Sequence, residues 1–248
     1  MPTATLRIVS FNVFYALGKK RLERTVFDAF ARLDPDAICL QEVLIGKKRN
    51  FAQDLADSMN YHLSFSLRAT FGSRSIGMAI LTKKLPLKND SIILPHSSHR
   101  RPRILQTVTF KTRDIRWRIA NTQLNVASPK TRQAQLETIL GILSAKRNKL
   151  PTILAADFNT KTGKEITIFT STLREAGFAS RKTPTYSWKL FGIKTKPGRE
   201  KFLGIRVKGK FDWIAVRNCT ISAAGMLNQV QGSDHKPVWA DITYPMIK

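Results

Sequence analysis

Short apolar runs that end in a polar residue recur along this chain, and they predict alternating strands and helices. Residues 6–11 alternate and then become apolar, which is typical of a strand. A helix is expected next, because apolar residues recur at helical spacing until Asp34-Pro35 interrupts the pattern. These residues are Leu22, Val26, Phe30 and Leu33. An apolar run at residues 37–40 then predicts a second strand.

The rest of the chain continues this alternation. Helices are expected at about residues 51–59 and at 133–144, where apolar residues share one face. Short apolar runs predict the remaining strands at residues 61–65, 76–81, 105–110, 117–124, 153–156, 211–216 and 238–242. The pattern indicates an α/β or α+β chain. Because its strands repeatedly end in a polar group, we expect a site at the sheet edges.

The polar groups at these strand ends form seven short motifs that can be parts of one site. They are Ser10-Phe11-Asn12, Gln41-Glu42, Asn121-Thr122-Gln123-Leu124, Asp157-Phe158-Asn159, Phe211-Asp212-Trp213, Ser233-Asp234 and His235. Carboxylates, carboxamides and an imidazole so far apart in the chain meet only if the fold gathers them at one edge of a core. Such a set suits the binding of a hard divalent cation and the hydrolysis of a phosphate ester.

Two of these motifs place carboxylates where they can serve a metal ion or a water molecule. Glu42 follows an apolar run, so its carboxylate is held rigidly as suits a Mg²⁺ ligand, although a surface glutamate is the alternative. Asp157 and Asn159 are two residues apart, so in extended chain both face one side. Asp157 can then orient or deprotonate water and Asn159 can donate to a phosphoryl oxygen, whereas an Asx turn is the alternative.

His235 is one of four histidines, and it directly precedes an expected strand. An imidazole there can protonate a leaving oxygen or stabilise a pentacovalent phosphorane, provided that a carboxylate fixes its tautomer. Asp212 is the candidate for that carboxylate.

The charge balance points to a polyanionic partner. The chain has 42 lysines and arginines against 17 aspartates and glutamates, which gives a formal net charge of +25. Such a field attracts nucleic acid or an anionic membrane surface, although charge kept for solubility is an alternative reading. Basic clusters occur at residues 19–21, at 47–49, at Arg100, Arg101 and Arg103, and throughout 189–210.

The segment 189–210 is the richest of these clusters. It has eight basic residues and one acidic residue, and Trp188, Phe191 and Phe202 lie in or beside it. Basic and aromatic side chains together hold a nucleic-acid backbone and stack on its bases. Because the segment precedes the strand that carries Asp212, we expect it to overhang the site. The candidate nucleic-acid contacts are Arg103, Lys194, Lys196, Arg199, Lys201 and Lys208.

The 248 residues show no repeat and no composition shift, so we expect a single domain over 1–248 with a basic insertion at about 189–210, and a monomer.

The two cysteines, in the apolar runs 36–41 and 214–221, lack metal-type spacing and are expected to pack as small hydrophobic residues in a reducing compartment. No apolar run approaches the roughly 18 residues that span a bilayer, and no signal-like stretch precedes the first strand. These features predict a soluble cytoplasmic protein.

Taken in order, the motifs resemble those of the endonuclease/exonuclease/phosphatase superfamily, over nearly the whole chain from Ser10 to His235. The resemblance implies a four-layer sandwich of two β-sheets flanked by helices, with the site at one end. It also implies that Glu42 is the main ligand of a Mg²⁺ or Mn²⁺ ion. Asn12 would then lie beside the metal, and Asp234 would help to hold the metal or its waters.

The resemblance implies roles for the catalytic side of the site as well. Asp157 would orient the attacking water, Asn159 would contact the phosphate, and Asp212 would pair with His235. One position departs from the common pattern, because many members have Thr-His-Leu where this chain has Thr122-Gln123-Leu124. A carboxamide can donate a hydrogen bond to the phosphate but cannot transfer a proton, so a mechanism with two histidines is not expected here.

These features together predict a Mg²⁺- or Mn²⁺-dependent nuclease that cleaves DNA within a strand. One alternative is a phosphodiesterase or phosphatase acting on a lipid or a small phosphorylated molecule. Another is a nucleic-acid-binding protein with an impaired site, for which Gln123 is the only support. Three questions stay open at this point. The substrate can be DNA or RNA, the cleavage can be a nick or a double-strand break, and the role can be DNA repair or degradation.

Overall fold

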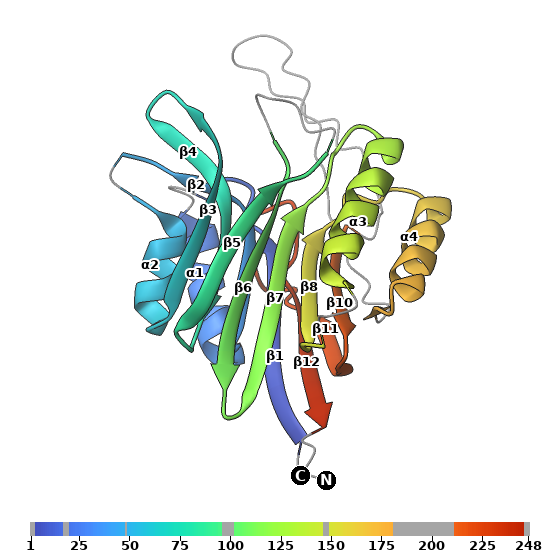
Figure 1. The fold of residues 1–248 in the computed structure, drawn as a ribbon. Coiled ribbons are helices and arrows are strands. Elements are labelled where there is room, and N and C mark those ends of the chain that lie inside the picture. The colour runs from blue at the N-terminus through green and yellow to red at the C-terminus, as the bar shows by residue number, and fades with distance from the viewer. Residues whose placement is uncertain are drawn as a thin grey trace.

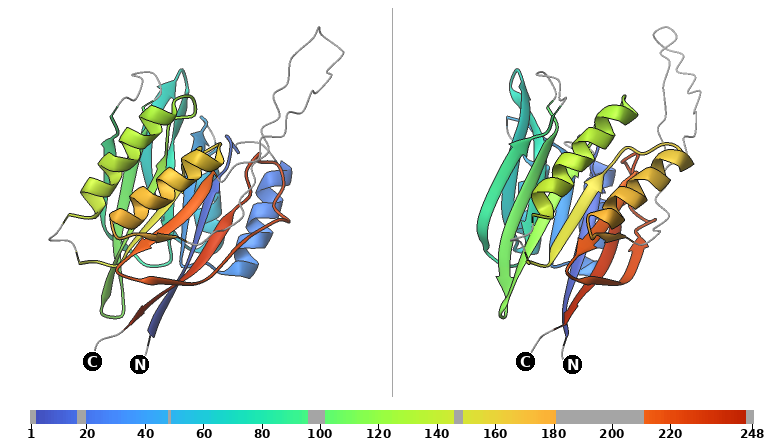
Figure 2. Two further views of the ribbon diagram at one scale, coloured as in Figure 1. Left: turned by 90° about the vertical axis from the view of Figure 1, so that its right-hand side faces the viewer. Right: turned by 45° about the vertical axis from the view of Figure 1, so that its right-hand side comes forward.

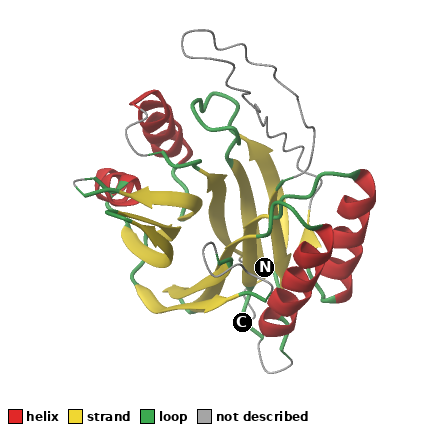
Figure 3. Ribbon diagram, turned by 90° about the horizontal axis from the view of Figure 1, so that it is seen from above, coloured by secondary structure: helices red, strands yellow, loops and turns green. Residues whose placement is uncertain are grey.

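The computed structural model describes residues 3–16, 20–47, 49–95, 102–145, 149–180 and 211–245. These residues form two six-stranded mixed β-sheets that pack face to face, with helices on both outer sides (Figure 1). The predicted four-layer sandwich is therefore confirmed. Viewed from above, the helices lie on opposite sides of the two sheets (Figure 3).

The first sheet, sheet A, is formed mainly by the two ends of the chain. In order across the sheet, its strands are β11 (Thr220–Met226), β12 (Val238–Pro245), β1 (Thr3–Asn12), β2 (Ala37–Ile45), β4 (Arg74–Thr82) and β3 (His62–Phe71). The helices α1 (Lys20–Leu33) and α2 (Phe51–Met59) cover its outer face. The β1–β2 pair is parallel, so the chain crosses over through α1 between these strands.

The second sheet, sheet B, is built from the middle of the chain. In order across the sheet, its strands are β5 (Pro86–Ile93), β6 (Ile104–Thr112), β7 (Ile115–Gln123), β8 (Thr152–Asp157), β10 (Asp212–Arg217) and β9 (Ala179–Ser180). The helices α3 (Pro129–Leu143) and α4 (Gly163–Glu175) lie side by side on its outer face (Figure 2). The parallel β7–β8 pair is connected through α3.

Three apolar clusters hold the four layers together. Between the sheets, Ile8 of sheet A packs in one buried cluster with Trp117 and Ile214 of sheet B. A second cluster joins sheet A to α1 and α2, and a third joins sheet B to α3 and α4. The central strands of each sheet are thus buried on both faces, which explains why the sequence shows continuous apolar runs there instead of strict alternation.

The strand registers bring the polar motifs to one edge of the sandwich, the upper end in Figure 1. In sheet A, Asn12 at the end of β1 is the partner of Gln41 in β2. In sheet B, Gln123 at the end of β7 is the partner of Asp157, and Asp157 is also the partner of Asp212. Three strands of sheet B therefore present polar side chains in one row.

The structure also contains elements that the apolar pattern did not predict, namely α4, β5, β9 and β11. The strand predicted at residues 211–216 is confirmed as β10, which ends at Arg217, and the chain turns at Asn218, whose φ is 61°. Cys219 lies in this turn and is only partly buried. The single domain and the basic insertion at about 189–210 stay predictions, because residues 181–210 lie outside the described part of the chain.

None of the helices in the described ranges combines the length and apolar character that a bilayer-spanning segment requires.

Candidate active site

A cavity of about 190 Å³ opens at the edge where the strands present their polar ends. We call it the site cavity. It is lined by Asn12, Phe14, Tyr15, Glu42, Arg68, Arg103, Gln123, Val126, Asp157, Asn159, Asp234 and His235. Residues from both sheets contribute, so the cavity exists only because the two sheets are packed together.

Asp157 lies fully buried at the base of the site cavity, at the end of β8. Its Oδ2 accepts hydrogen bonds from Asn12 Nδ2 at 3.0 Å and from Gln123 Nε2 at 3.0 Å. Its Oδ1 accepts from the backbone N–H of Asn159 at 3.1 Å. Three donors from three segments therefore fix the orientation of this carboxylate and compensate for its removal from water.

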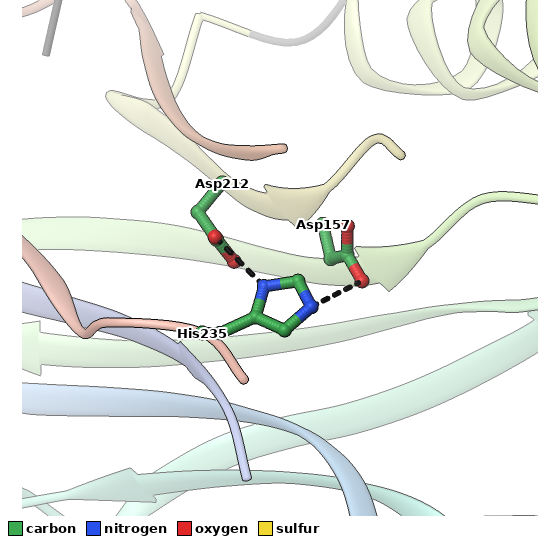
Figure 4. A group of neighbouring side chains, drawn as sticks. All are labelled: Asp157, Asp212 and His235. Atoms are coloured by element: carbon green, nitrogen blue, oxygen red, sulfur yellow. Dashed lines mark hydrogen bonds and ion pairs between the residues drawn. The ribbon is translucent and has the colours of Figure 1, made fainter. Parts of the chain in front are cut away.

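His235, which lines the site cavity, forms a buried pair with Asp212 (Figure 4). His235 Nδ1 is 2.9 Å from Asp212 Oδ2, and the other ring nitrogen, Nε2, faces Asp157 Oδ2 at 4.0 Å and Asp234 Oδ1 at 3.9 Å. The backbone N–H of His235 donates to Ser233 Oγ, whose hydroxyl donates to the backbone carbonyl of Asn12. The imidazole is therefore held between three carboxylates and tied to the end of β1.

These carboxylates determine the charge of the imidazole. Burial alone lowers the pKa of His235, but Asp212, Asp157 and Asp234 outweigh that effect and raise it to about 10. Burial raises the pKa of Asp212 to about 6, although the neighbouring His235 opposes this shift. At neutral pH the structure therefore favours a positively charged imidazole that is hydrogen-bonded to Asp212.

Glu42 reaches the site cavity through a bulge in β2. The pairing register between β2 and β4 shifts between Leu40 and Val43, and Glu42 adopts a φ of 56°. A left-handed backbone at a residue other than glycine costs on the order of 1–3 kcal/mol and occurs preferentially at functional sites. The bulge turns the Glu42 side chain toward sheet B, where Glu42 Oε1 accepts a hydrogen bond of 2.6 Å from Gln123 Nε2.

Gln123 lies between the acidic and the basic side chains of the site. Its Nε2 donates to Glu42 and Asp157, and its Oε1 accepts from Arg68 Nη1 at 2.7 Å and from Arg103 Nη1. Burial and the nearby Arg68 lower the pKa of Arg103 to about 10. Both amide hydrogens of Gln123 are thus directed at carboxylates in this structure, whereas a hydrogen bond to the phosphate was expected from the sequence.

A second polar contact, between Gln41 and Asn121, lies beneath the site and connects the two sheets. Gln41 Nε2 in sheet A donates to Asn121 Oδ1 in sheet B at 2.8 Å. Asn121 Nδ2 in turn donates to the backbone carbonyls of Leu40 and Ala79. All these side-chain groups are buried. The two amides therefore connect the sheets one layer beneath Glu42 and Gln123, and this contact accounts for the Gln41 and Asn121 positions in the sequence motifs.

Asn159 reaches the site cavity differently from the prediction. The expectation of extended chain over Asp157 and Asn159 is wrong, because β8 ends at Asp157 and Asn159 has a φ of 54°. The Asp157 side chain accepts the Asn159 N–H, which is the Asx turn considered as the alternative. Asn159 still lines the site cavity, with its Nδ2 donating to the backbone carbonyl of Leu124.

The structure brings together all the predicted site residues that lie in its described part. Asn12, Glu42, Gln123, Asp157, Asn159, Asp234, His235 and Arg103 line the site cavity, and Asp212 contacts it through His235. The other predicted nucleic-acid contacts lie outside the described residues: Lys194, Lys196, Arg199, Lys201 and Lys208. The catalytic and binding roles of all these residues stay predictions.

Sequence reasoning missed Arg68, Phe14 and Tyr15 among the residues that line the site cavity. Arg68 is buried on β3 together with the alternate residues Ser64 and Ser66, and this polar alternation was the available signal. Phe14 and Tyr15 directly follow the Asn12 motif, and their rings pack with centroids 5.7 Å apart. These two aromatic rings therefore add an apolar part to the lining of an otherwise polar cavity.

A profile of the endonuclease/exonuclease/phosphatase family matches residues 9–235, which is most of the chain. The chain belongs to this family. Its enzymes hydrolyse phosphoesters and use divalent metal ions. The family match spans every motif from the end of β1 to His235.

Solved structures show the same fold. A family protein from Leptotrichia buccalis is 18% identical, with a TM-score of 0.73, over 96% of this chain and 99% of that one. The human Nocturnin catalytic domain with a bound sulfate anion is 17% identical, with a TM-score of 0.70, over 98% and 97%. A Bacteroides thetaiotaomicron mannosyl-6-phosphatase is 16% identical, with a TM-score of 0.68, over 96% and 99%. Likeness at these identities establishes the fold alone. The search of curated proteins found no match.

Proposed function

We propose that the protein is a divalent-metal-dependent nuclease that hydrolyses phosphodiester bonds within DNA strands. The observation that carries the choice of nucleic acid is the formal charge of +25 on a chain that gathers several of its 17 acidic residues around one cavity. A surface with such an excess of lysine and arginine concentrates a polyanion near the site. Family membership supports the phosphoester chemistry.

The donor set of the site cavity fits a hard divalent cation such as Mg²⁺ or Mn²⁺. Glu42 and Asp234 offer carboxylate oxygens and Asn12 offers a carboxamide oxygen, the ligand types that such ions prefer. Asp157, Asp212 and His235 also offer ligand atoms within 4.8 Å of one another. We favour the first set, because His235 Nδ1 is already hydrogen-bonded to Asp212. A bound ion would stabilise negative charge on the phosphate.

The chain's own residues supply the remaining chemistry. Asp157, oriented by its three hydrogen bonds, is placed to align a water molecule for attack on phosphorus. The charged His235 imidazole, fixed by Asp212, directs its Nε2 toward the same space and can stabilise the phosphorane or protonate the leaving oxygen. Arg68 and Arg103 add fixed positive charge on the opposite side of Gln123.

A second candidate is a phosphatase or phosphodiesterase that acts on a small phosphorylated molecule. The small volume of the site cavity and its two arginines favour it, because a terminal phosphate carries more negative charge than a diester. The fold relative that is named as a mannosyl-6-phosphatase gives this candidate further support.

A substrate panel separates the two candidates. Supercoiled plasmid, abasic duplex, single-stranded DNA, RNA, a sugar phosphate, an inositol phosphate and sphingomyelin would each be incubated with Mg²⁺, with Mn²⁺ and with chelator. We expect plasmid nicking that requires added metal. Preferential hydrolysis of a small phosphate or of sphingomyelin would replace the proposal with the second candidate.

Two substitutions test the site within the same panel. Glu42→Ala and His235→Ala should each lower plasmid nicking by at least about 10²-fold, because they remove a metal ligand and a group that stabilises the transition state. Glu175→Ala and His62→Ala, at exposed positions on α4 and β3, are the matched controls and should keep full activity. Near-normal nicking by either folded site variant would show that the site is assigned wrongly.

A further inference from the structure

A second hollow, of about 410 Å³, lies between the first turns of α3 and α4. We call it the α3–α4 groove. Its apolar lining, which we call the floor, consists of the buried Phe169 with Ala127, Pro129 and Ile168, and its exposed lysines Lys130, Lys161 and Lys164 are called the rim. The volume lies within the roughly 300–1,000 Å³ of pockets that hold organic ligands. An apolar floor with a basic rim suits a ligand that combines a flat, weakly polar group with phosphate.

The α3–α4 groove adjoins the site cavity through two loops. Val126 lines the site cavity, and the next residue, Ala127, lines the groove. On the loop after β8, Asn159 lines the site cavity and Lys161, two residues later, lines the groove, where Lys161 Nζ donates to the backbone carbonyl of Val126 at 2.9 Å. A chain-like substrate with one phosphate in the site cavity can therefore continue directly into the groove.

The charge of the groove matches a polyanion. Its lining contains four basic side chains and one acid, Glu165. Glu165 is already bound by Arg132, whose Nε lies 2.6 Å from Glu165 Oε1. Lys130 and Lys164 are exposed, and neither forms an ion pair with an acidic residue of the described ranges. Their charges are therefore available to a ligand.

We propose that the α3–α4 groove binds the DNA strand that flanks the scissile phosphate, with a base or sugar against the apolar floor and backbone phosphates at Lys130 and Lys164. This inference rests on the proposed nuclease function. It gives the enzyme a second region that contacts DNA, beside the site cavity, within the described part of the chain. Charge complementarity and continuity with the site cavity favour nucleic acid over an apolar partner.

Binding in the absence of cleavage is the first test. The double variant Lys130→Gln/Lys164→Gln would be compared with the wild type by fluorescence anisotropy of a labelled single-stranded oligonucleotide in chelator, over a series of salt concentrations. We expect its Kd to rise by about 3–10-fold at low salt. The slope of log Kd against log salt should fall by roughly 0.7 for each phosphate that the variant no longer neutralises.

The matched control is Lys84→Gln/Lys149→Gln, which removes the same charge from the opposite end of the sheets. Lys84 follows β4, which pairs its Thr82 with Ala37 at the start of β2, and Lys149 precedes β8. Both lysines are exposed. If the groove variant and this control have the same Kd and the same slope, the groove does not bind DNA.

A second pair of variants tests whether the oligonucleotide contacts the apolar floor of the groove. Ile168 and Ile142 are exposed to nearly the same extent, 42% and 41%, on the outer helices, but only Ile168 lines the groove. Ile168→Glu should weaken oligonucleotide binding by more than Ile142→Glu does, because it places a negative charge on the floor. Equal effects of the two substitutions would exclude the floor as a contact.

Kinetics separate a failure of this inference from a failure of the proposed function. Bis(p-nitrophenyl) phosphate is a small diester that reaches only the site cavity. The groove variants should raise KM for DNA while kcat/KM for this diester stays at the wild-type value. Equal losses on both substrates would mean that the groove acts through the site cavity and would overturn the inference. A wild-type enzyme that neither binds nor cleaves DNA would instead remove the proposed function and this inference together.

Discussion

At the scale of single residues, Gln123 is the side chain whose contacts reveal most about the site. A histidine at this position would titrate, whereas the carboxamide stays neutral and offers two donors and one acceptor group at every pH. Here the donors hold Glu42 and Asp157 and the acceptor holds Arg68 and Arg103. Gln123 therefore separates side chains of opposite charge, and under the proposed function this separation would leave the Glu42 carboxylate to a metal ion.

Replacing Gln123 should therefore act on metal binding as well as on turnover. We expect Gln123→Ala to lower kcat/KM by about 10–10²-fold, which corresponds to roughly 1–3 kcal/mol, the size of hydrogen bonds to charged groups. The metal concentration for half-maximal activity should rise, because Arg68 can then pair with Glu42. Titration of activity with Mg²⁺ measures both effects, and Gln53→Ala on the exposed side of α2 is the control. If Gln123→Ala needs the same metal concentration as the wild type, Gln123 does not affect metal binding and serves only in packing.

The raised pKa of His235, about 10, predicts a dependence of stability on pH. A group whose folded-state pKa exceeds its unfolded value of about 6.5 stabilises the fold fully below the unfolded value, and this contribution is lost as pH rises toward 10. The difference in unfolding free energy between the wild type and His235→Asn should thus be largest near pH 6 and should narrow up to pH 10. Urea unfolding in chelator measures it. The exposed His62→Asn serves as the control, and a constant difference would contradict the raised pKa.

At the scale of elements, the ion pair between α3 and α4 supports the region around the α3–α4 groove. Arg132 and Glu165 are both buried, with a distance of 2.6 Å between Nε and Oε1, and Arg132 also donates to the backbone carbonyls of Asn125 and Val126. Val126 and Asn125 belong to the loop that borders the site cavity. The pair therefore connects the packing of two helices to the position of this loop.

Removing one partner should destabilise the protein much more than removing both. Arg132→Met leaves the Glu165 carboxylate buried without its cation, for which we expect a loss of about 3–5 kcal/mol of unfolding free energy. The double variant Arg132→Met/Glu165→Leu should recover most of this loss, because no uncompensated charge is left. Urea unfolding of the two variants provides the measurement. A double variant as unstable as the single one would show that the hydrogen bonds from Arg132 to the loop dominate.

The elements also show how far the sequence predicts this structure. Buried strands and α1 to α3 were predicted because their apolar residues follow the period of the element. Helix α4 was missed because β-branched residues fill it, among them Ile166, Thr167 and Ile168, and its helical form depends on packing against sheet B. Strand β5 was missed because it is an exposed edge strand whose residues need not alternate.

The site was predictable to the extent that its residues follow strands. Motifs at the ends of β1, β7 and β8 converge because the strand registers align them, and the polar residues that end the apolar runs indicate which ends these are. Arg68 was not predicted: the polar alternation along β3 marks it as facing inward, but its contact with Gln123 depends on the packing of sheet A against sheet B. The turn at Asn159 was not predicted either, since it requires the Asp157 side chain as acceptor.

At the scale of the whole molecule, the described acidic residues are largely paired or gathered at the site. Outside the site, Asp241 binds Arg7, Asp34 binds Lys83 and Asp90 binds Lys88. These surface pairs contribute little to stability, about 0–1 kcal/mol each, but they neutralise both partners. The net charge of +25 is the excess of 42 basic over 17 acidic residues, so most basic residues have no acidic residue to neutralise them.

This excess charge predicts that DNA affinity falls steeply with salt, and the segment 189–210 provides the test at this scale. Replacing Lys194, Lys196, Arg199 and Lys201 by glutamine should flatten the slope of log Kd against log salt by roughly 0.7–0.9 for each phosphate that is no longer neutralised. KM for DNA should rise more than kcat falls, because the catalytic groups are unchanged. Fluorescence anisotropy and initial rates over a salt series measure both quantities.

The variant of segment 189–210 has to be compared with a control variant that has the same net charge. A control that replaces Lys84, Lys88, Lys111 and Lys149 by glutamine removes four charges from sheet edges and turns, none of which lines the site cavity or the α3–α4 groove. If the long-range field alone draws DNA to the protein, both variants lose affinity equally. If the segment 189–210 contacts the strand, its variant has the smaller slope while the control keeps a slope close to the wild type. Equal slopes in all three proteins would remove the segment from the interface and leave the α3–α4 groove as the proposed contact beyond the site cavity.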